Sequence, residues 1–465
     1  MSRFEKILLN VLFIELFIGG GGRLIDFGIL SIRQVLYILL FCTFIFRLIK
    51  TKSFFNKKVN TFIRFTPVTI GVYILIGWCF ISAVIGWIYD HPLSAVITDL
   101  LRVSYIAIYF PLAYYINNSR FSITHIIKII KYSALTVAIF TITITLLGKT
   151  IFINNFNNYY NFLNTIMNDD LFFRPSNSVF YKSHFYVLIG LILSLNAALT
   201  KKHSKVDLFN IFLCTLSIIW SETRGFLLAF MVSILAILLI DTKIITDPVK
   251  GLKEKIRLLG NSKFFLKKSA ILLIVFISVP ILYQTMTLSR FQIDTADEQV
   301  DNSGLKYGLE EKLILGSKGS KGQTKERVEV NDVSVNTRMS FILASKDILL
   351  SNPVNFIFGT GYGTEIDGRI SGIEMSFLDI LVEQGLIGLC IWGFLFMIVY
   401  INFYIVYKRQ KTLNTTDISF MSIFLGVLLL TNINPFINNP IGMGFMLIVL
   451  IYSQIRKDEV KTLPV

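Results

Sequence analysis

The sequence predicts an all-α polytopic membrane protein with about twelve transmembrane helices and a large extracytoplasmic loop. Of the 465 residues, 54% are hydrophobic and 16% are charged, whereas soluble domains carry about 25% charged residues. The mean hydropathy is +0.64, and apolar runs of about 20 residues, long enough to cross a bilayer, recur along the whole chain. These observations exclude a water-soluble globular protein, a disordered chain and a secreted disulfide scaffold.

Hydropathy assigns twelve candidate membrane helices to the chain. They cover residues 7–18, 29–49, 67–89, 93–117, 124–148, 180–199, 205–221, 223–241, 269–288, 385–407, 416–434 and 440–456. No small-residue cleavage site follows the first run. We therefore expect it to remain as a helix rather than to be removed as a signal peptide.

Lys and Arg residues gather in alternate loops of this span pattern. Six lie between residues 47 and 64 and eight between residues 243 and 268, whereas the turns 89–93 and 432–440 contain none. Cytoplasmic loops carry such an excess, so we expect both termini in the cytoplasm and the large loop outside. The net charge of +15 therefore indicates membrane orientation and not nucleic-acid binding.

The span pattern divides the chain into three segments. Residues 1–287 hold helices one to nine with an outer loop at 149–180, residues 288–376 form the large loop with amphipathic helices, and residues 377–465 hold helices ten to twelve. Within the large loop, residues 303–332 mix Gly, Lys and Glu and are expected to be solvated. The run GSKGSKG from Gly316 lacks the G-K-[ST] ending of a phosphate loop, which favours a linker.

The second half of the large loop shows a helical pattern. Thr337 is a suitable N-cap, and apolar residues recur after it at helical spacing as far as Pro353, which predicts an amphipathic helix. A glycine-rich turn, FGTGYG, follows from Phe358. Residues 370–384 then lead into the tenth span and carry three carboxylates, Glu374, Asp379 and Glu383.

Ionisable residues inside the spans are few, and all of them fall toward the outer face. They are Glu15, Arg33, Asp99, Arg102, Glu222 and Arg224. A charge in the bilayer costs several kcal/mol, so those that remain usually serve a function. Asp99 and Arg102 are three residues apart and can instead neutralise each other, and Glu15 and Arg33 can pair to fix helix packing. Arg224 lies on a different helix face from Glu222, which favours a functional role.

Arg338 adds a cation from the large loop. We expect it in the first turn of the helix after Thr337, where free amides and the helix dipole favour an anion. The planar guanidinium can donate two parallel hydrogen bonds to a phosphate, which makes a stronger phosphate site than a helix end alone. A solvated arginine at a helix end would, however, give the same sequence pattern. Further cations of the outer segments are Arg174, Lys182 and Arg369.

Two stretches, one in the large loop and one that runs from its end into the tenth span, resemble the signature of the O-antigen polymerase and ligase superfamily. They read TRMSFILASKDILLSNPVNFIFGTGYG from Thr337 and GIEMSFLDILVEQGLIGL from Gly372. They share with that signature an arginine opening a helix, a G-x-G turn and a glycine-rich helix entry. The stretch SETRGFLLAF from Ser221 resembles the arginine-glycine motif at the outer end of an earlier span in the same group.

The resemblance implies a GT-C-like membrane glycosyltransferase of the bacterial cytoplasmic membrane. Such an enzyme takes a glycan from a polyprenyl-pyrophosphate carrier at the outer face, makes O-antigen, capsule or exopolysaccharide, and needs no cofactor. The role implies a chain-length regulator and a flippase as partner proteins. Ligases of the group carry a histidine where this chain reads Glu374-Met375-Ser376, and none of its four histidines lies in the large loop. A Wzy-type polymerase of repeat units is therefore the nearest match.

The resemblance also implies a binding site. Arg224 and Arg338 match the family arginines that engage the pyrophosphate, and fixed cations in a water-poor site can stabilise the departing group without a metal. The expected substrate-binding residues are Arg224, Arg338, Arg102, Arg369, Gly359, Gly361 and Tyr362.

Either Glu374 or Asp379 is expected to accept the proton of the acceptor hydroxyl, and Glu374 is preferred. The expected catalytic set is Glu374, Asp379, Arg338 and Arg224. We expect no metal site, because loop carboxylates such as the pairs Asp169–Asp170 and Glu365–Asp367 are usually solvated. The four cysteines lie singly in apolar runs, at none of the spacings of metal sites.

Three other functions are weighed against the polymerase. A ligase would transfer finished glycan to a lipid or protein acceptor, and a flippase would move the same lipid-linked sugars across the membrane. Transporters tend to have duplicated halves with charges at the midplane, whereas this chain shows no internal repeat and its cations lie toward one face. A purely structural membrane protein would leave Arg224 and the patterned loop unexplained.

Overall fold

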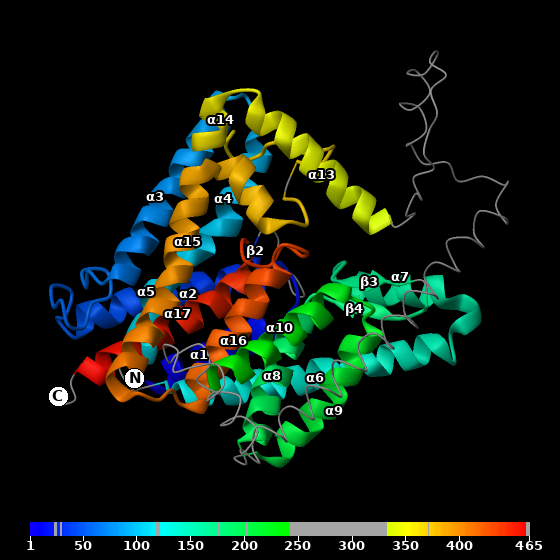
Figure 1. Ribbon diagram of the computed structural model, residues 1–465, viewed down its shortest axis with the longest axis horizontal. Coiled ribbons are helices and arrows are strands. Elements are labelled where there is room, and N and C mark those ends of the chain that lie inside the picture. Colours follow the sequence, from blue (N-terminus) through cyan, green and yellow to red (C-terminus); the bar gives the residue numbers. More distant parts are fainter. Residues whose placement is uncertain are drawn as a thin grey trace, which may run out of the picture.

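The computed structural model describes residues 1–22, 26–27, 30–117, 121–174, 176–200, 203–241, 333–370 and 372–461. Over these residues the chain is mostly helical, with two short β-hairpins (Figure 1). The helices are α1 (Arg3–Ile18), α2 (Ile32–Lys50), α3 (Pro67–Ile88), α4 (Leu93–Ser104), η1 (Tyr105–Ile108), α5 (Tyr109–Asn117), α6 (Ile123–Lys149), η2 (Ile153–Asn155), α7 (Phe156–Ile166), α8 (His184–Leu199), α9 (Lys205–Trp220), α10 (Arg224–Asp241), α13 (Val333–Leu350), α14 (Pro353–Phe358), α15 (Ser376–Gln410), α16 (Thr415–Leu430) and α17 (Pro440–Lys461). The predicted helical class is confirmed.

Five helices of the described part are long and apolar enough to cross a membrane. They are α2, α3, the segment Leu93–Ile116 that begins with α4, α6 and α15. Three further apolar helices, α8, α10 and α16, are shorter. The expected ninth span, 269–288, and the expected solvated stretch, 303–332, lie outside the described residues, so the count of twelve spans stays a prediction.

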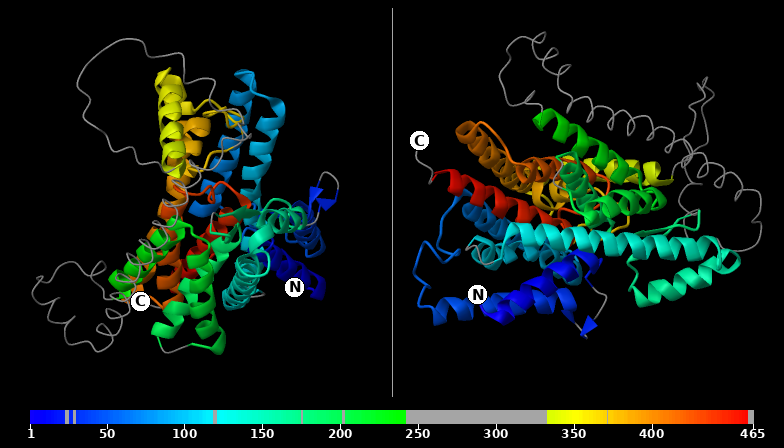
Figure 2. Two further views of the ribbon diagram at one scale, coloured as in Figure 1. Left: turned by 90° about the vertical axis from the view of Figure 1, so that its right-hand side faces the viewer. Right: turned by 90° about the horizontal axis from the view of Figure 1, so that it is seen from below.

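Two helices form the centre of the molecule. Every residue of α8 from His184 to Asn196, and every residue of α17 from Ile441 to Gln454, is buried. A helix that is apolar on all sides must be enclosed by others. α8 packs against α6, α9, α10 and α16, and α17 packs against α15, α5, α16 and α1. Figure 2 shows α6 between α1 on one side and α8 and α9 on the other.

The fourth expected span is not one continuous helix. α4 passes into the 3-10 turn η1 and then into α5. Pro111 lies in α5, and because proline has no backbone N–H, the carbonyl four residues earlier loses its helical partner. The tighter 3-10 geometry occupies that position.

The outer loop at 149–180 is folded, which differs from a purely α-helical expectation. It contains η2, α7 and the start of an antiparallel hairpin in which β3 (Leu171–Phe173) pairs with β4 (Val179–Tyr181). A second short hairpin joins β1 (Asp26–Phe27) to β2 (Leu30–Ser31). The aromatic residues of the outer loop pack together, since the rings of Phe152 and Tyr159 stack with centroids 4.4 Å apart.

Segments expected on the same side of the membrane meet in the structure. Arg64 pairs with Asp458 at 2.8 Å and Arg47 pairs with Glu5 at 3.6 Å, all in expected cytoplasmic segments. Figure 1 shows the start of α1 and the end of α17 at this end of the molecule, away from α14. The turn between α16 and α17 lies against α13 and the start of α15, and it contributes to the site described next.

Candidate functional site

Arg338 lies half-buried on α13, next to the α16–α17 turn. Its Nη2 donates to the carbonyl oxygen of Ile433 at 3.3 Å and lies 3.5 Å from Glu374 Oε2. Its Nε is buried and has no hydrogen-bond partner among the residues that the structure describes. A buried donor without an acceptor costs about 1–3 kcal/mol. The side chain as a whole is 27% exposed, so its guanidinium remains accessible to an anionic acceptor.

The expected start of this helix is wrong. α13 begins at Val333, ahead of Thr337, so Arg338 lies in its second turn. Residues 333–336 include neither Gly nor Pro, and nothing in them stops the helix from starting earlier. The contribution that we expected from free amides around Arg338 is therefore absent, because such amides belong to the first turn.

Glu374 lies between two arginines. Its Oε2 is 3.5 Å from Arg338 Nη2 and its Oε1 is 4.0 Å from Arg369 Nη1. The guanidinium of Arg369 also lies over the ring of Phe341, 5.2 Å from its centroid, which favours one orientation of the arginine. The side chain of Glu374 is 38% exposed. The structure therefore brings three of the expected site residues together and leaves the carboxylate accessible.

Arg224 is connected to this group through the same turn. It is the first residue of α10, and the next residue, Gly225, packs directly on Ile433: a Cβ at Gly225 would lie 3.0 Å from Ile433 Cγ2. Ile433 also accepts the hydrogen bond of Arg338. Ile433 thus contacts Arg338 directly and contacts Gly225, the residue after Arg224. Of the two, Arg224 is the arginine in the first turn of a helix, where the dipole favours an anion.

Arg174 of the outer loop holds the turn that precedes Arg224. Its Nε donates to Ser221 O and its Nη2 to Thr223 Oγ1, each at 3.2 Å. Glu222, between them, has a left-handed φ of 51° and accepts from Ser178 Oγ at 3.1 Å. Hydrogen bonds from Arg174 and Ser178 of the outer loop therefore hold the turn before α10 in place.

Arg102 belongs to a buried cluster of charges between α4 and α15. Its Nη2 lies 3.2 Å from Asp99 Oδ1, 3.3 Å from Asp379 Oδ2 and 3.7 Å from Glu383 Oε2. The three carboxylates are at most 3% exposed and Arg102 is 14% exposed. The pairing of Asp99 with Arg102 is confirmed, and two further carboxylates share it. The contacts of Arg102 are internal to the fold.

Asp379 is held by more than Arg102. Its Oδ2 accepts from Asn438 Nδ2 at 2.6 Å, and its Oδ1 accepts from the backbone N–H of Ile373 at 3.3 Å. With all its neighbours in place the carboxylate is 1% exposed. Asp379 therefore lies beneath the segment that carries Glu374, whereas Glu374 itself reaches the surface.

The glycine-rich turn is buried against the kink of α15. Gly385 has a φ of 69° inside α15, which interrupts the helix, and the carbonyls before it need other partners. Glu383 O accepts from Gly361 N at 3.0 Å, and Val382 O accepts from Thr360 N at 2.8 Å. Gly361 also approaches α3 so closely that a Cβ would lie 2.1 Å from Gly86 N. The turn thus closes the kink with its backbone.

Gly359 and Tyr362 have similar internal contacts. A Cβ at Gly359 would lie 2.6 Å from the carbonyl carbon of Glu383. Tyr362 is fully buried, and its hydroxyl accepts from Gln384 Nε2 at 3.2 Å. Within the described residues, the expected binding role of this turn is thus accompanied by a packing role for each of its three named residues, Gly359, Gly361 and Tyr362.

Other charged residues named above also have internal partners. Arg33 Nε lies 3.0 Å from Glu15 Oε2, so the pairing of the first two helices is confirmed. Asp170 is buried and binds Lys182 Nζ at 2.6 Å, and Asp367 accepts from Ser340 Oγ at 2.5 Å.

We did not expect the α16–α17 turn to be part of the site. We treated residues 432–440 only as an outer turn without basic residues. In the structure Ile433 contacts both arginine segments, and Asn438 and Thr431 hold the start of α15 through Asp379 and Ser376. Asn and Pro repeat in this turn, which is typical of an ordered turn, but a backbone carbonyl as a ligand leaves no sequence signal.

Comparison with known proteins finds a relative along nearly the whole chain. The chain is 25% identical over 458 residues, 97% of its length, to an O-antigen polymerase from Shigella flexneri, and the match covers 95% of that protein. No protein-family model matches the chain. The resemblance to the O-antigen polymerases that the motifs indicated is thereby confirmed.

Proposed function

We propose that this protein is a glycosyltransferase that polymerises polyprenyl-pyrophosphate-linked oligosaccharide repeat units into a surface polysaccharide, either O-antigen, capsule or exopolysaccharide, at the outer face of the bacterial cytoplasmic membrane. Two observations support the general activity: the relative in Shigella flexneri is an O-antigen polymerase, and the chain contains several helices that could cross a membrane. A chain-length regulator and a flippase would be its partner proteins.

The arginine site is the observation that carries the proposal. The Arg338 side chain is 27% exposed and donates to the carbonyl oxygen of Ile433, and Arg224 precedes Gly225, which packs on the same Ile433 at the start of α10. Guanidinium groups bind phosphate oxygens in pairs of parallel hydrogen bonds. Two of them beside one turn are suited to the two phosphates of a pyrophosphate, with Arg369 as a third cation.

α13 also offers a surface for the lipid part of the substrate. Its protein-facing side buries Phe341, Ser345 and Leu349. Its other side exposes four apolar residues, Met339, Ile342, Leu343 and Leu350, together with the charged residues Lys346 and Asp347. Such a mixed exposed face is suited to the membrane interface, where the apolar part of a lysine side chain can lie among lipids while its amine reaches the headgroups. That position would place Arg338 at the depth of lipid phosphates.

The reaction needs a base and a stabilised leaving group. Glu374 takes the proton from the acceptor hydroxyl. At the same time the oxygen of that hydroxyl forms a bond to the anomeric carbon of the donor sugar. The bond between that carbon and the phosphate oxygen breaks, and its electron pair leaves with the pyrophosphate. Arg338 and Arg224 balance the charge that grows on the departing group. Arg102 and Asp379 support the segment that carries Glu374.

The proposal is tested with the purified full-length chain in lipid nanodiscs and lipid-pyrophosphate-linked repeat units. We expect longer glycan chains from the wild type and a loss of at least about 100-fold in Arg224→Ala and Arg338→Ala. Arg338→Lys keeps the positive charge but loses the planar guanidinium with its paired hydrogen bonds. It should retain only part of the wild-type activity.

Arg64→Ala is the matched control, because Arg64 is a half-buried, ion-paired arginine among the expected cytoplasmic segments. It should elongate glycan normally. Normal elongation by correctly folded Arg224→Ala and Arg338→Ala would overturn the mechanism. Transfer of substrate across vesicles without elongation would indicate a flippase instead.

A further inference from the structure

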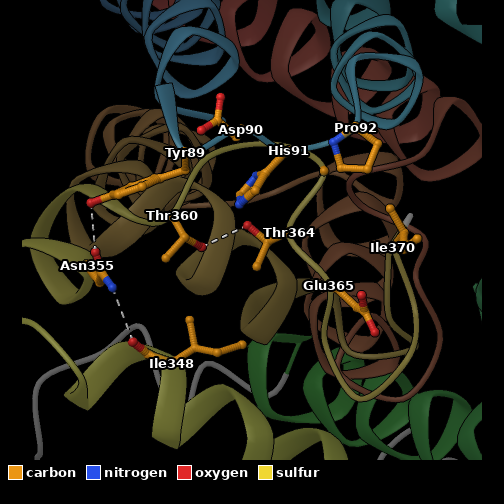
Figure 3. Close-up of a pocket in the computed structure, with 11 residues that line it drawn as sticks. Tyr89, Asp90, His91, Pro92, Ile348, Asn355, Thr360, Thr364, Glu365 and Ile370 are labelled. Atoms are coloured by element: carbon orange, nitrogen blue, oxygen red, sulfur yellow. Dashed lines mark hydrogen bonds between the residues drawn. The ribbon is translucent and has the colours of Figure 1, made fainter. Parts of the chain in front are cut away.

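A cavity of about 430 Å³ opens where the α3–α4 turn meets α13, α14 and the loop after α14. Its volume lies within the range of about 300–1,000 Å³ that small-molecule sites occupy. Figure 3 shows His91 beside Thr360 and Thr364, with Tyr89 and Asn355 on one side and Glu365 and Ile370 on the other.

The walls of the cavity are held by hydrogen bonds. Thr360 Oγ1 and Thr364 Oγ1 lie 2.8 Å apart, and Tyr89 OH donates to Asn355 Oδ1 at 3.1 Å. His91 Nδ1 lies 2.9 Å from the carbonyl oxygen of Tyr362. A carbonyl oxygen only accepts, so in the neutral ring Nδ1 carries the proton and Nε2 remains an acceptor. The site is therefore preformed by side chains from three segments.

Two carboxylates at the cavity are not committed to the fold. Asp90 and Glu365 are exposed, and neither makes an ion pair or a side-chain hydrogen bond with another residue of the described ranges. Asp90 has a left-handed φ of 57°, which Asp and Asn tolerate better than most residues. Both carboxylates are thus available to accept hydrogen bonds from a ligand.

The chemistry of the lining points to a neutral, hydroxyl-rich ligand. The cavity combines carboxylates, an imidazole, an amide and hydroxyls with the ring of Tyr89 and contains no Lys or Arg. A phosphate would be repelled by Asp90 and Glu365. The described residues hold no group of three His, Cys, Asp or Glu side chains that could bind a metal ion. A sugar ring offers hydroxyls to acceptors and an apolar face to an aromatic ring.

The cavity is joined to the arginine site through one loop. Ile370 lines the cavity, while its neighbour Arg369 faces Glu374. At the other edge Gly363 lines the cavity, and its backbone N–H donates to Asp99 of the buried cluster at 3.1 Å. Ile370 at the cavity is thus four residues along the chain from Glu374, the proposed base.

We infer that this cavity is a saccharide subsite, which holds sugar units of the glycan while its reacting end lies at Glu374. The inference rests on the proposed function, because it assigns the glycan part of the same substrate to a separate set of residues. Arg338 and Arg224 bind the pyrophosphate, and Asp90, Glu365 and His91 bind the sugars.

The test separates the two parts of the substrate. Repeat-unit oligosaccharide, released from its carrier by mild acid, and farnesyl pyrophosphate are each titrated calorimetrically into the full-length protein in nanodiscs. We expect the double variant Asp90→Asn and Glu365→Gln to bind the oligosaccharide about tenfold more weakly and farnesyl pyrophosphate as the wild type does. Ile370→Trp, which narrows the cavity, should also weaken oligosaccharide binding. Arg338→Ala should bind farnesyl pyrophosphate more weakly and the oligosaccharide as the wild type does.

Asp347→Asn is the matched control, since Asp347 is an exposed carboxylate of α13 that does not line the cavity. Unchanged oligosaccharide affinity in the double variant and in Ile370→Trp, with pyrophosphate binding intact, overturns the subsite and leaves the proposed function standing. Binding of Ca²⁺ that the double variant loses, without oligosaccharide binding, assigns the carboxylates to a metal and also overturns it. A wild type that binds neither probe counts against the proposed function itself.

Discussion

The backbone N–H of Ile373 donates to Asp379 Oδ1 at 3.3 Å, and this contact ties the segment that carries Glu374 to the buried charges around Arg102. Gly372 packs directly against the guanidinium of Arg102, since a Cβ at position 372 would be 2.1 Å from Arg102 Nη1. The position of the exposed carboxylate is therefore set by charges that lie beneath it. Variants of Asp379 and Glu374 should separate the structural role of the buried carboxylate from the catalytic role of the exposed one.

Asp379→Asn should destabilise the protein. Asp379 accepts from Ile373, Asn438 and Arg102 with its two oxygens, whereas an asparagine offers one oxygen and turns an NH₂ group toward donors. A buried donor that loses its acceptor costs about 1–3 kcal/mol. We expect a lower thermal unfolding temperature in detergent together with reduced elongation. An unchanged unfolding temperature would contradict the role of Asp379 as a buried anchor.

Glu374→Gln should remove activity without a loss of stability. The side chain is 38% exposed, and exposed ion pairs contribute about 0–1 kcal/mol. Loss of a general base lowers kcat by about 10²–10⁴, and KM should change little because the arginines remain. Steady-state kinetics with lipid-linked repeat units measures both constants. If kcat stays near the wild-type value, another residue accepts the proton.

Gly372→Ala should disturb the site through Arg102. Gly372 has a φ of 72°, and the added methyl group would meet Arg102 Nη1. Gly368→Ala is the matched control, because Gly368 has a φ of 77° but nothing within 4 Å of its Cβ position. Both variants carry backbone strain of about 1–3 kcal/mol, so a larger loss of stability in Gly372→Ala measures the contact with Arg102. Equal losses would show that Arg102 moves aside freely.

Local sequence patterns predicted some of this site and could not predict the rest. The three-residue spacing of Asp99 and Arg102 predicted their pairing, and opposed spans predicted the pairing of Glu15 with Arg33; both are confirmed. Asp379 and Glu383 reach Arg102 only because α15 lies beside α4, and no short-range pattern carries that arrangement.

Residue preferences also misled us at one helix end. Threonine favours an N-cap but also occurs inside helices, so Thr337 gave the wrong start for α13. Ile433 contributes its backbone carbonyl and its side-chain surface, which any apolar residue could offer. The folded turn, and not the residue type, makes it part of the site.

Arg174→Ala should loosen the start of α10. The variant removes two hydrogen bonds to Ser221 and Thr223, and each such bond to a charged group contributes about 1.5–3 kcal/mol. The amide of Phe226, which donates to Thr223 O at 3.1 Å, should then exchange with solvent faster, as hydrogen exchange followed by mass spectrometry would measure. Elongation should fall because Arg224 is no longer held in place. Exchange at wild-type rates would mean that the outer loop does not support this turn.

Larger residues at position 225 should separate Arg224 from the α16–α17 turn. A Cβ at Gly225 would lie 3.0 Å from Ile433 Cγ2 and 3.2 Å from Leu430 Cδ1. Alanine needs only small shifts of these side chains, so Gly225→Ala should keep most of the activity. Gly225→Leu overpacks the contact at a cost of about 1–3 kcal/mol and moves the start of α10. We expect it to bind farnesyl pyrophosphate more weakly and to elongate glycan poorly, while Gly393→Leu, whose Cβ position has no neighbour within 4 Å, behaves as the wild type. If Gly225→Leu folds and keeps full pyrophosphate affinity, Arg224 does not need the turn at Ile433, and the two arginines act independently.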